Sequence, residues 1–191
     1  TTPVVAVDNY NWCFRNHVPV VSGTTGWLER WDEVMMSREQ LGGGFFYASN
    51  YSIGVNIFFH LNRWLARTMA RFADYKVSVE ETHHIHKLDA PSGTALTLAK
   101  DILKEHPEYT SWVLDEGKVE AGELPVKAKR EGEVPGIHSV TYKSSVDEIQ
   151  IYHSAYSRDG FAQGAGMAAE FLMGKKGVFG MEDLIKIKDE N

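Results

Sequence analysis

The 191-residue sequence is acidic on balance, with 20 Lys and Arg residues against 26 Asp and Glu residues and a formal net charge of -6. This balance argues against non-specific nucleic-acid binding through a basic face. A composition of 43% hydrophobic and 24% charged residues is that of a soluble globular protein, and no apolar run approaches the length needed to cross a bilayer. A single cysteine cannot form an internal disulfide, and no secretory leader opens the sequence, so we expect a cytoplasmic protein.

The first fifty residues alternate between predicted helices and predicted strands. Pro3 suits the first turn of a helix from Val4 to Asn16, and the apolar residues 18–21 predict a strand. A second helix is expected near Leu28 to Gln40 and a second strand over Phe45 to Ala48. This order predicts parallel strands joined by crossover helices. Because a dinucleotide-binding sheet normally starts with a strand, a glycine-rich turn and a helix, we infer an N-terminally incomplete chain.

A short loop with polar or glycine residues follows each of these two strands. Gly23-Thr24-Thr25-Gly26 follows the first strand, and Ala48-Ser49-Asn50-Tyr51 follows the second. Ligands of open α/β sheets bind at the carboxyl ends of the strands. Either loop alone would be an ordinary strand-to-helix turn, but two such loops after successive strands support each other as a binding site.

The middle of the chain predicts a long helix and then a strand. Ser52 can cap a helix in which apolar residues recur at helical spacing. These residues are Ile57, Leu61, Leu65, Met69 and Phe72. From Tyr75 to Glu80 apolar and polar residues alternate, which is typical of a half-buried strand.

The last third of the chain predicts three more strands and a helix. The strands are expected over Val126 to Arg130, Ile137 to Tyr142 and Glu148 to His153, with a polar turn between the last two. A helix from Phe161 to Met173 contains small residues that allow close packing. We therefore expect an α/β chain whose second domain is α+β, with a mixed, largely antiparallel sheet layered on helices.

The segment from Glu80 to Thr94, EETHHIHKLDAPSGT, concentrates titratable and turn-forming residues. His83, His84, His86 and Lys87 supply positive charge, and histidine can change its protonation near neutral pH. Repulsion among these groups should keep His83 neutral until an anion binds. A lone histidine would more often be a solvated or satisfied polar residue, but this contiguous pattern predicts a site that holds and protonates a small anion.

The turn Asp89-Ala90-Pro91-Ser92-Gly93-Thr94 leads into a helix with apolar periodicity. Gly93 lets a ligand approach the backbone, Ser92 and Thr94 offer hydroxyl donors, and the free N–H groups of a helix start favour a carboxylate. On its own this turn would be a helix N-cap. The cationic segment before it makes carboxylate binding the favoured interpretation, and Asp89 is expected to orient the turn or the lysine.

A metal site is the main alternative for a histidine cluster. His84 and His86 would share one side of an extended strand, and His106, His138 and His153 could approach from elsewhere. No cysteine pair or helical histidine spacing supports a closed zinc site, so we expect no bound metal.

The string His83-His84-Ile85-His86-Lys87-Leu88-Asp89-Ala90-Pro91-Ser92-Gly93-Thr94-Ala95 resembles the signature of the 4-hydroxy-tetrahydrodipicolinate reductase family, also called dihydrodipicolinate reductases. The two strand-end loops, Ser157-Arg158 and the segment from Phe161 to Ala165 also resemble the family, so the resemblance covers essentially the whole chain. It implies reduction of 4-hydroxy-tetrahydrodipicolinate to tetrahydrodipicolinate with NADH or NADPH, in lysine and diaminopimelate biosynthesis. The implied substrate is a small heterocyclic dicarboxylate.

The resemblance also implies roles for individual residues. His83 is the implied general acid/base, and Lys87 is its partner donor. The implied substrate-binding residues are His84, Ser92, Gly93, Thr94, Thr25 and Arg158. The implied cofactor-binding residues are Gly23, Thr24, Thr25, Ala48, Ser49, Asn50 and Tyr51. From the residues alone, an ion pair with Asp159 is nearly as good an interpretation of Arg158 as a substrate contact.

By the same resemblance, residues 1–51 with 158–191 form a partial Rossmann-type dinucleotide-binding domain. Residues 52–157 form a substrate-binding and oligomerisation domain of a homotetramer. The family's glycine-rich phosphate loop has no counterpart here, and neither has the residue that would distinguish NADH from NADPH. The alternative functions are therefore a non-catalytic oligomerising fragment that lacks the phosphate-binding loop, or a His-cluster metal-binding domain.

Overall fold

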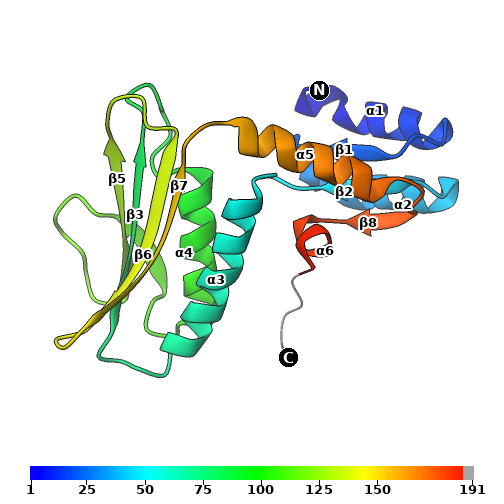
Figure 1. The fold of residues 1–191 in the computed structure, drawn as a ribbon. Coiled ribbons are helices and arrows are strands. Elements are labelled where there is room, and N and C mark those ends of the chain that lie inside the picture. The colour runs from blue at the N-terminus through cyan, green and yellow to red at the C-terminus, as the bar shows by residue number, and fades with distance from the viewer. Residues whose placement is uncertain (187–191) are drawn as a thin grey trace. The chain divides into compact units, whose positions relative to one another are not determined.

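Two compact units make up the chain (Figure 1). The structure is a computed structural model that describes residues 1–186. Unit 1 contains Thr1–Asn56 and the described residues from Asp159 onward, and unit 2 contains Ile57–Arg158. Helix α3, Ile53–Met69, begins in unit 1 and lies mostly in unit 2. Within residues 1–186 no helix has both the length and the apolar character needed to cross a membrane.

Unit 1 is built on a three-stranded parallel sheet with the order β1-β2-β8. Its elements in chain order are α1 (Pro3–Arg15), β1 (Val20–Ser22), the 3-10 helix η1 (Leu28–Arg30), α2 (Trp31–Leu41), β2 (Gly44–Tyr47), α5 (Asp159–Leu172), β8 (Gly177–Phe179) and α6 (Met181–Ile185). The predicted alternation of helices with parallel strands is confirmed. β8 and α6 were not predicted, because three to five residues are too few to show a periodic pattern.

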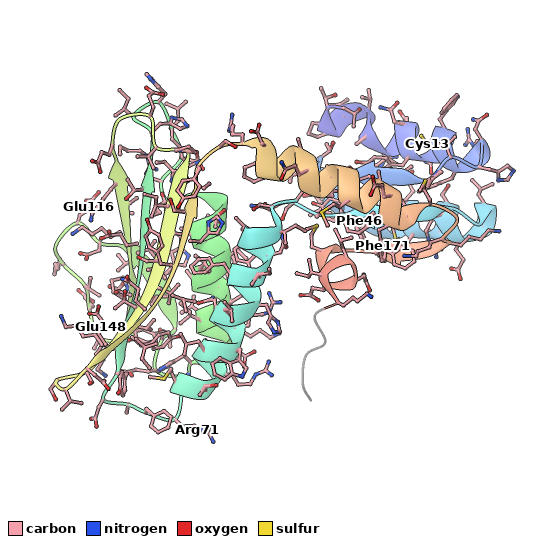
Figure 2. All side chains as sticks on the ribbon, in the orientation of Figure 1. Cys13, Phe46, Arg71, Glu116, Glu148 and Phe171 are labelled. Carbon is pink, nitrogen blue, oxygen red and sulfur yellow. The ribbon has the colours of Figure 1, made fainter. Side chains whose placement is uncertain are left out.

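The two phenylalanines of β2 show why helices cover both faces of this sheet. Successive strand residues point to opposite faces. Phe45 packs with Tyr10 and Phe14 of α1, whereas Phe46 packs against Phe171 of α5, with ring centroids 6.0 Å apart (Figure 2). Helices on both faces of a parallel sheet are the arrangement of a doubly wound α/β unit.

Unit 2 is built on a five-stranded mixed sheet with the order β4-β5-β3-β6-β7. Its further elements are β3 (Lys76–His83), α4 (Gly93–Glu105), β4 (Ser111–Leu114), β5 (Glu123–Arg130), β6 (Gly136–Lys143) and β7 (Glu148–Ala155). The pairs β3–β5 and β4–β5 are parallel, and β3–β6 and β6–β7 are antiparallel. Helices α3 and α4 lie on one face of the sheet (Figure 1). The predicted mixed α/β architecture is confirmed, and β4 is the strand that was not predicted.

The predicted helix α3 is present, but its apolar residues do not form one buried face. Ser52 accepts a hydrogen bond from the Val55 amide at 3.3 Å, so the predicted cap is confirmed. Ile57 and Leu61 are 43% and 44% exposed, and the helix ends before Phe72. The buried residues of α3 form a face beside the predicted one: Val55, Phe58, Phe59, Asn62, Leu65, Ala66 and Met69.

The alternation predicted for β3 is confirmed and continues to the end of the strand. Val77 and Val79 are buried, and Glu81 and His83 follow at the same two-residue spacing, 0% and 7% exposed. Because β3 is the central strand, its end is flanked by β5 and β6. A buried carboxylate and a buried imidazole at this position mark the candidate site.

Candidate active site

The Glu81 carboxylate is the centre of the candidate site in unit 2. Its Oε1 accepts hydrogen bonds from Nη1 and Nη2 of Arg130, both at 3.3 Å. The Ser92 amide lies 3.2 Å from Oε1 and 3.0 Å from Oε2. His83 Nδ1 and His138 Nε2 lie 3.6 and 3.7 Å from Oε2. A single buried charge therefore contacts β5, β6 and the start of α4, as well as its own strand.

The sheet register explains why these residues meet. Glu81 is opposite His138 in the antiparallel pair β3–β6, and His83 is beside Arg130 in the parallel pair β3–β5. Cross-strand neighbours on one face of a sheet contact each other directly. Ser92 is the N-cap of α4, and its hydroxyl lies 3.2 Å from His138 Nε2. The register thus joins the His83 strand end to the helix start that was predicted to bind an anion.

Burial and charge have opposite effects on the two titratable groups of this cluster. Burial alone would raise the pKa of Glu81, but hydrogen bonds from His138 and Ser92 lower it to about 2. Burial is the largest effect on His83 and lowers its pKa to about 4, although the Glu81 charge opposes the shift. At neutral pH the cluster therefore holds a carboxylate beside a neutral imidazole. We expected a neutral His83 from repulsion by its neighbours, and burial is the larger cause.

The turn after β3 holds Lys87 in place. Lys87 Nζ lies 2.8 and 2.9 Å from the two carboxylate oxygens of Asp89 and lowers the pKa of that carboxyl. Arg130 donates to the carbonyl oxygens of Lys87 and Asp89, at 3.3 and 2.5 Å. Asp89 was expected to orient the turn or the lysine, and its carboxylate pairs with the lysine. Arg130, at the end of β5, therefore binds both this turn and Glu81.

The adjacent histidines separate because β3 ends at His83. The His83 ring packs edge-on against His138, with centroids 5.0 Å apart. His84 is half-buried, and its ring centroid is 6.0 Å from that of His86. His86 is exposed, with Nε2 3.1 Å from a Glu133 oxygen. His83 thus belongs to the buried cluster, whereas His84 and His86 lie on the turn beside it.

The start of α4 leaves space beside Gly93. A Cβ built on Gly93 would meet no atom within 4 Å, and Thr94 is half-buried. Ser92 is 3% exposed, and both its amide and its hydroxyl already have partners within the cluster. Of the three predicted cradle residues, Gly93 and Thr94 are therefore open to a ligand, and Ser92 anchors the turn.

Three side chains of the cluster have the types and spacing of metal ligands. One ligand atom each from Glu81, His83 and His138 lie within 4.8 Å of one another. This set shares only His138 with the metal site considered from the sequence. The Arg130 guanidinium already binds the carboxylate, and its positive charge repels a second cation there. The donor set therefore suits a hydrogen-bonded network better than a metal ion.

In unit 1 the two predicted cofactor loops contact each other. The Ala48 amide and the Tyr51 hydroxyl both donate to the Ser22 carbonyl, at 3.2 and 2.8 Å. The Tyr51 ring packs on Gly23, where an added Cβ would lie 3.2 Å from the ring. Burial raises the pKa of Tyr51. Tyr51 is therefore a buried link between the loops, while Gly23 is exposed beside it.

The other predicted residues of these loops differ in exposure. Thr25 and Ser49 are exposed, and Thr24 and Asn50 are half-buried. The Thr24 carbonyl accepts a hydrogen bond of 2.6 Å from an indole nitrogen, and the Asn50 side chain accepts one of 2.9 Å from a backbone amide. Arg158 is exposed and is the last residue of unit 2. Thr25 lies in unit 1, and the His83 cluster lies in unit 2.

Four residues of the cluster were not singled out from the sequence: Glu81, Arg130, His138 as a partner of His83, and Gly136. A Cβ on Gly136 would lie 3.2 Å from His83 Nε2. Glu81 could have been found by continuing the alternation of β3 by one step. The other three lie on β5 and β6, and no local signal fixes the register that brings them to His83.

One unit has a parallel sheet with helices on both faces, and the other has a helix-backed mixed sheet with a buried carboxylate–imidazole cluster at a strand end. These features define a two-unit α/β protein with a titratable site. Similarity to known proteins identifies the family. Residues 54–185 match the family described as "Dihydrodipicolinate reductase, C-terminus". The chain belongs to the dihydrodipicolinate reductase family, as the signature after β3 suggested.

Individual relatives agree with this assignment. The 4-hydroxy-tetrahydrodipicolinate reductase of Christiangramia forsetii is 49% identical over 97% of this chain and 77% of its own length. That of Methanoregula boonei is 37% identical over 98% of this chain and 73% of its own length. A dipicolinate-bound dihydrodipicolinate reductase from Paenisporosarcina sp. TG-14 has a similar structure, with a TM-score of 0.75 and 25% identity over 96% of this chain and 71% of that one.

Proposed function

We propose that the chain reduces 4-hydroxy-tetrahydrodipicolinate to tetrahydrodipicolinate with NADH or NADPH, in lysine and diaminopimelate biosynthesis. The observation that carries this proposal is the link from His83 through Glu81 and Ser92 to the start of α4. This link connects a titratable imidazole to a helix N-terminus within one buried cluster. The choice of substrate follows from the relatives, which are named as reductases of this compound.

The proposed substrate is a dianion, and the groups around the start of α4 suit its carboxylates. The first amides of a helix have no partners within the helix and favour negative charge. Gly93 leaves the backbone accessible, Thr94 adds a hydroxyl, and His84 follows the end of β3 as a further proposed carboxylate contact. The similar Paenisporosarcina structure is a complex with dipicolinate, a planar dicarboxylate. Arg158 remains a further proposed carboxylate contact, and Thr25 a contact to the ring.

Proton handling is assigned to His83 and Lys87. Hydride addition to a conjugated C=N group, or loss of the ring hydroxyl as water, leaves charge that a nearby donor can neutralise. His83 is neutral in the unliganded cluster, and a bound dianion raises the pKa of a nearby imidazole. Substrate binding therefore favours protonation of His83, and the reaction consumes this proton. Lys87, held by Asp89, is the second proposed donor.

The two loops of unit 1 fit the nicotinamide end of a dinucleotide. They follow neighbouring parallel strands, where open α/β sheets bind ligands. Gly23 is exposed beside the Tyr51 ring, and Thr25 and Ser49 are exposed residues with hydroxyl groups. Hydroxyl and backbone groups are suitable partners for a carboxamide. When bound, the reduced nicotinamide supplies the hydride.

We propose a cytoplasmic homotetramer, as the resemblance implies. The end strands of the unit 2 sheet, β4 and β7, each have one edge unpaired within the described residues and could pair between subunits. Light scattering tests the assembly. Four copies are expected, and a monomer at working concentration contradicts it.

The function is tested by following oxidation of NADH and NADPH with the ring compound generated in situ. A calorimetric titration with pyridine-2,6-dicarboxylate tests the substrate site separately. We expect turnover and a saturable dicarboxylate complex. A folded, oligomeric chain that binds neither dicarboxylate nor cofactor contradicts the proposal and supports the non-catalytic alternative.

A further inference from the structure

The His83 imidazole lies between Glu81 and Gly136, two residues to which the proposed function assigns no chemical step. Its Nδ1 side faces the Glu81 carboxylate at 3.6 Å, and this nitrogen has no hydrogen-bond partner. Its Nε2 side faces Gly136, where a Cβ would lie 3.2 Å away. Glu81 thus supplies charge on one side of the ring, and the missing side chain of Gly136 avoids a tight contact on the other.

Glu81 has the same central position in the anion cradle. Its carboxylate accepts the Ser92 amide and is fixed by Arg130, which also binds the carbonyls of Lys87 and Asp89. Removing this side chain would leave the guanidinium and the Ser92 amide without their buried partner. The conformations of the turn after β3 and of the start of α4 both depend on it.

We propose that Glu81 is a positioning residue that couples the two halves of the site, the carboxylate cradle at the start of α4 and the imidazole that handles protons. Gly136 is its counterpart, because it keeps Nε2 of His83 accessible. This inference rests on the proposed reductase function for its catalytic consequence. Its structural part, the control of the His83 ring by Glu81, stands without that function.

The coupling acts through charge and orientation together. A carboxylate beside Nδ1 favours the tautomer with the proton on Nδ1, which leaves Nε2 as the nitrogen that receives and gives the second proton. The charged and titratable groups around His83 are Glu81 on β3, Arg130 on β5, His138 on β6 and Lys87 on the turn. Among them Glu81 alone stabilises the protonated imidazole, so its charge decides how readily His83 accepts a proton.

The test compares Glu81→Gln with the matched control Glu80→Gln in the full chain. Glu80 is the preceding residue of β3, and its carboxylate pairs with Lys129 at 2.7 Å, outside the cluster. The first readout is the nitrogen NMR spectrum of the histidine rings during a pH titration. The His83 signals are assigned by their absence in His83→Gln. The second readout is the separation of kcat from KM for the ring substrate.

In Glu81→Gln we expect His83 to titrate at lower pH than in the parent and to lose its preference for the Nδ1–H tautomer. We expect kcat to fall by about tenfold or more. KM should stay the same or fall, because the Gln amide oxygen can still accept the Ser92 hydrogen bond and a negative charge near the dianion is removed. A purely structural role would lower stability and raise KM without changing the His83 titration. Glu80→Gln should keep the parent values in every readout.

The proposal is overturned if Glu81→Gln and Glu80→Gln give the same His83 titration, tautomer and kcat. Should Glu81→Gln fail to fold, Gly136→Ala takes its place, since its methyl group would press on Nε2 from the other side. We expect that variant to lose kcat with little change in KM, and a parent-like kcat overturns the inference. A parent protein that neither binds pyridine-2,6-dicarboxylate nor oxidises cofactor refutes the reductase function instead, and the NMR comparison still decides the role of Glu81.

Discussion

Units 1 and 2 both carry candidate ligand-binding loops at the ends of buried strands, but they hold those loops by different interactions. In unit 1 the Tyr51 ring packs on Gly23, and the Tyr51 hydroxyl and the Ala48 amide both donate hydrogen bonds to the Ser22 carbonyl. In unit 2 a buried carboxylate binds a guanidinium and a helix N-terminus, as Glu81 does with Arg130 and Ser92. The loops of unit 1 are therefore held by the packing of side chains, and those of unit 2 are held by charge. A change of side-chain volume should disrupt the first, and a change of charge or proton affinity the second.

The largest effect is expected from the proton-handling group of unit 2. His83→Gln removes the titratable nitrogen but keeps a polar side chain, so turnover should fall about 10²- to 10³-fold with dicarboxylate binding retained. Steady-state rates of cofactor oxidation measure the loss. His86→Gln is the control, because His86 is exposed and pairs with Glu133. Equal turnover of His83→Gln and its parent would eliminate the assignment of His83.

The corresponding test in unit 1 changes the volume of a side chain and leaves its charge unchanged. A Cβ on Gly164 of α5 would lie 1.8 Å from the Tyr51 carbonyl oxygen, so Gly164→Ala must displace the loop or the helix. We expect unit 1 to lose about 3 kcal/mol of stability, as in severe overpacking. Gly166→Ala is the control, since its Cβ would meet nothing within 4 Å. That variant should gain about 0.5–1 kcal/mol from helix propensity.

Urea denaturation of the two glycine variants measures this contrast. The interpretation of unit 1 as held by shape is wrong if Gly164→Ala is as stable as Gly166→Ala. A loss of cofactor binding in Gly164→Ala, with dicarboxylate binding unchanged, would show that packing in unit 1 affects the cofactor site alone.

A smaller effect is expected at the carboxylate cradle. Thr94→Val keeps the shape of the side chain and removes its hydroxyl, so the dissociation constant of pyridine-2,6-dicarboxylate should rise about tenfold, equivalent to about 1.4 kcal/mol. Calorimetry measures the change, and His84→Gln should weaken binding in the same direction. Thr97→Val is the control one turn further along α4, where the hydroxyl bonds to the Gly93 carbonyl. Unchanged affinity in Thr94→Val removes Thr94 from the site.

The smallest effect concerns a charge of unit 2 outside the site. Burial raises the pKa of Asp101 on α4 from 3.8 to about 6, although Arg63 opposes the shift at 3.6 Å. The folded state thus binds the proton more tightly than the unfolded state, and this contribution to stability is lost as pH rises through about 6. Asp101→Asn should be more stable than the parent by about 1 kcal/mol at neutral pH and equal to it near pH 4.

Denaturation at both pH values checks this prediction, with the exposed Asp74→Asn as control. A variant that is less stable than the parent at neutral pH shows that the ion pair with Arg63 outweighs the cost of burial.

Local patterns in the sequence predicted most of the fold. Helical spacing and strand alternation located α1, α2, α4, α5 and every strand of unit 2 except β4. They located neither β8 nor α6, because these elements are shorter than the period that would reveal them. For α3 the spacing was right, but which face becomes buried depends on the sheet and α4, which lie far away in sequence.

The site could be predicted only in part for the same reason. His83, Lys87 and the Ser92 to Thr94 turn lie within twelve residues of chain, so a contiguous motif revealed them. Arg130 and His138 reach the cluster through strand register, and register is a property of the folded sheet. No local pattern predicted that the Ser92 amide would bind Glu81 and its hydroxyl His138. These contacts leave Gly93 and Thr94 as the open groups.

The most direct test of the central claim is a backbone amide NMR titration of the chain with pyridine-2,6-dicarboxylate. We predict that the Gly93 and Thr94 amides shift in a saturable way and that the His83 ring takes up a proton on binding. Shifts confined to other parts of the chain, or an unchanged His83 ring at saturation, would contradict a dicarboxylate site built around Glu81.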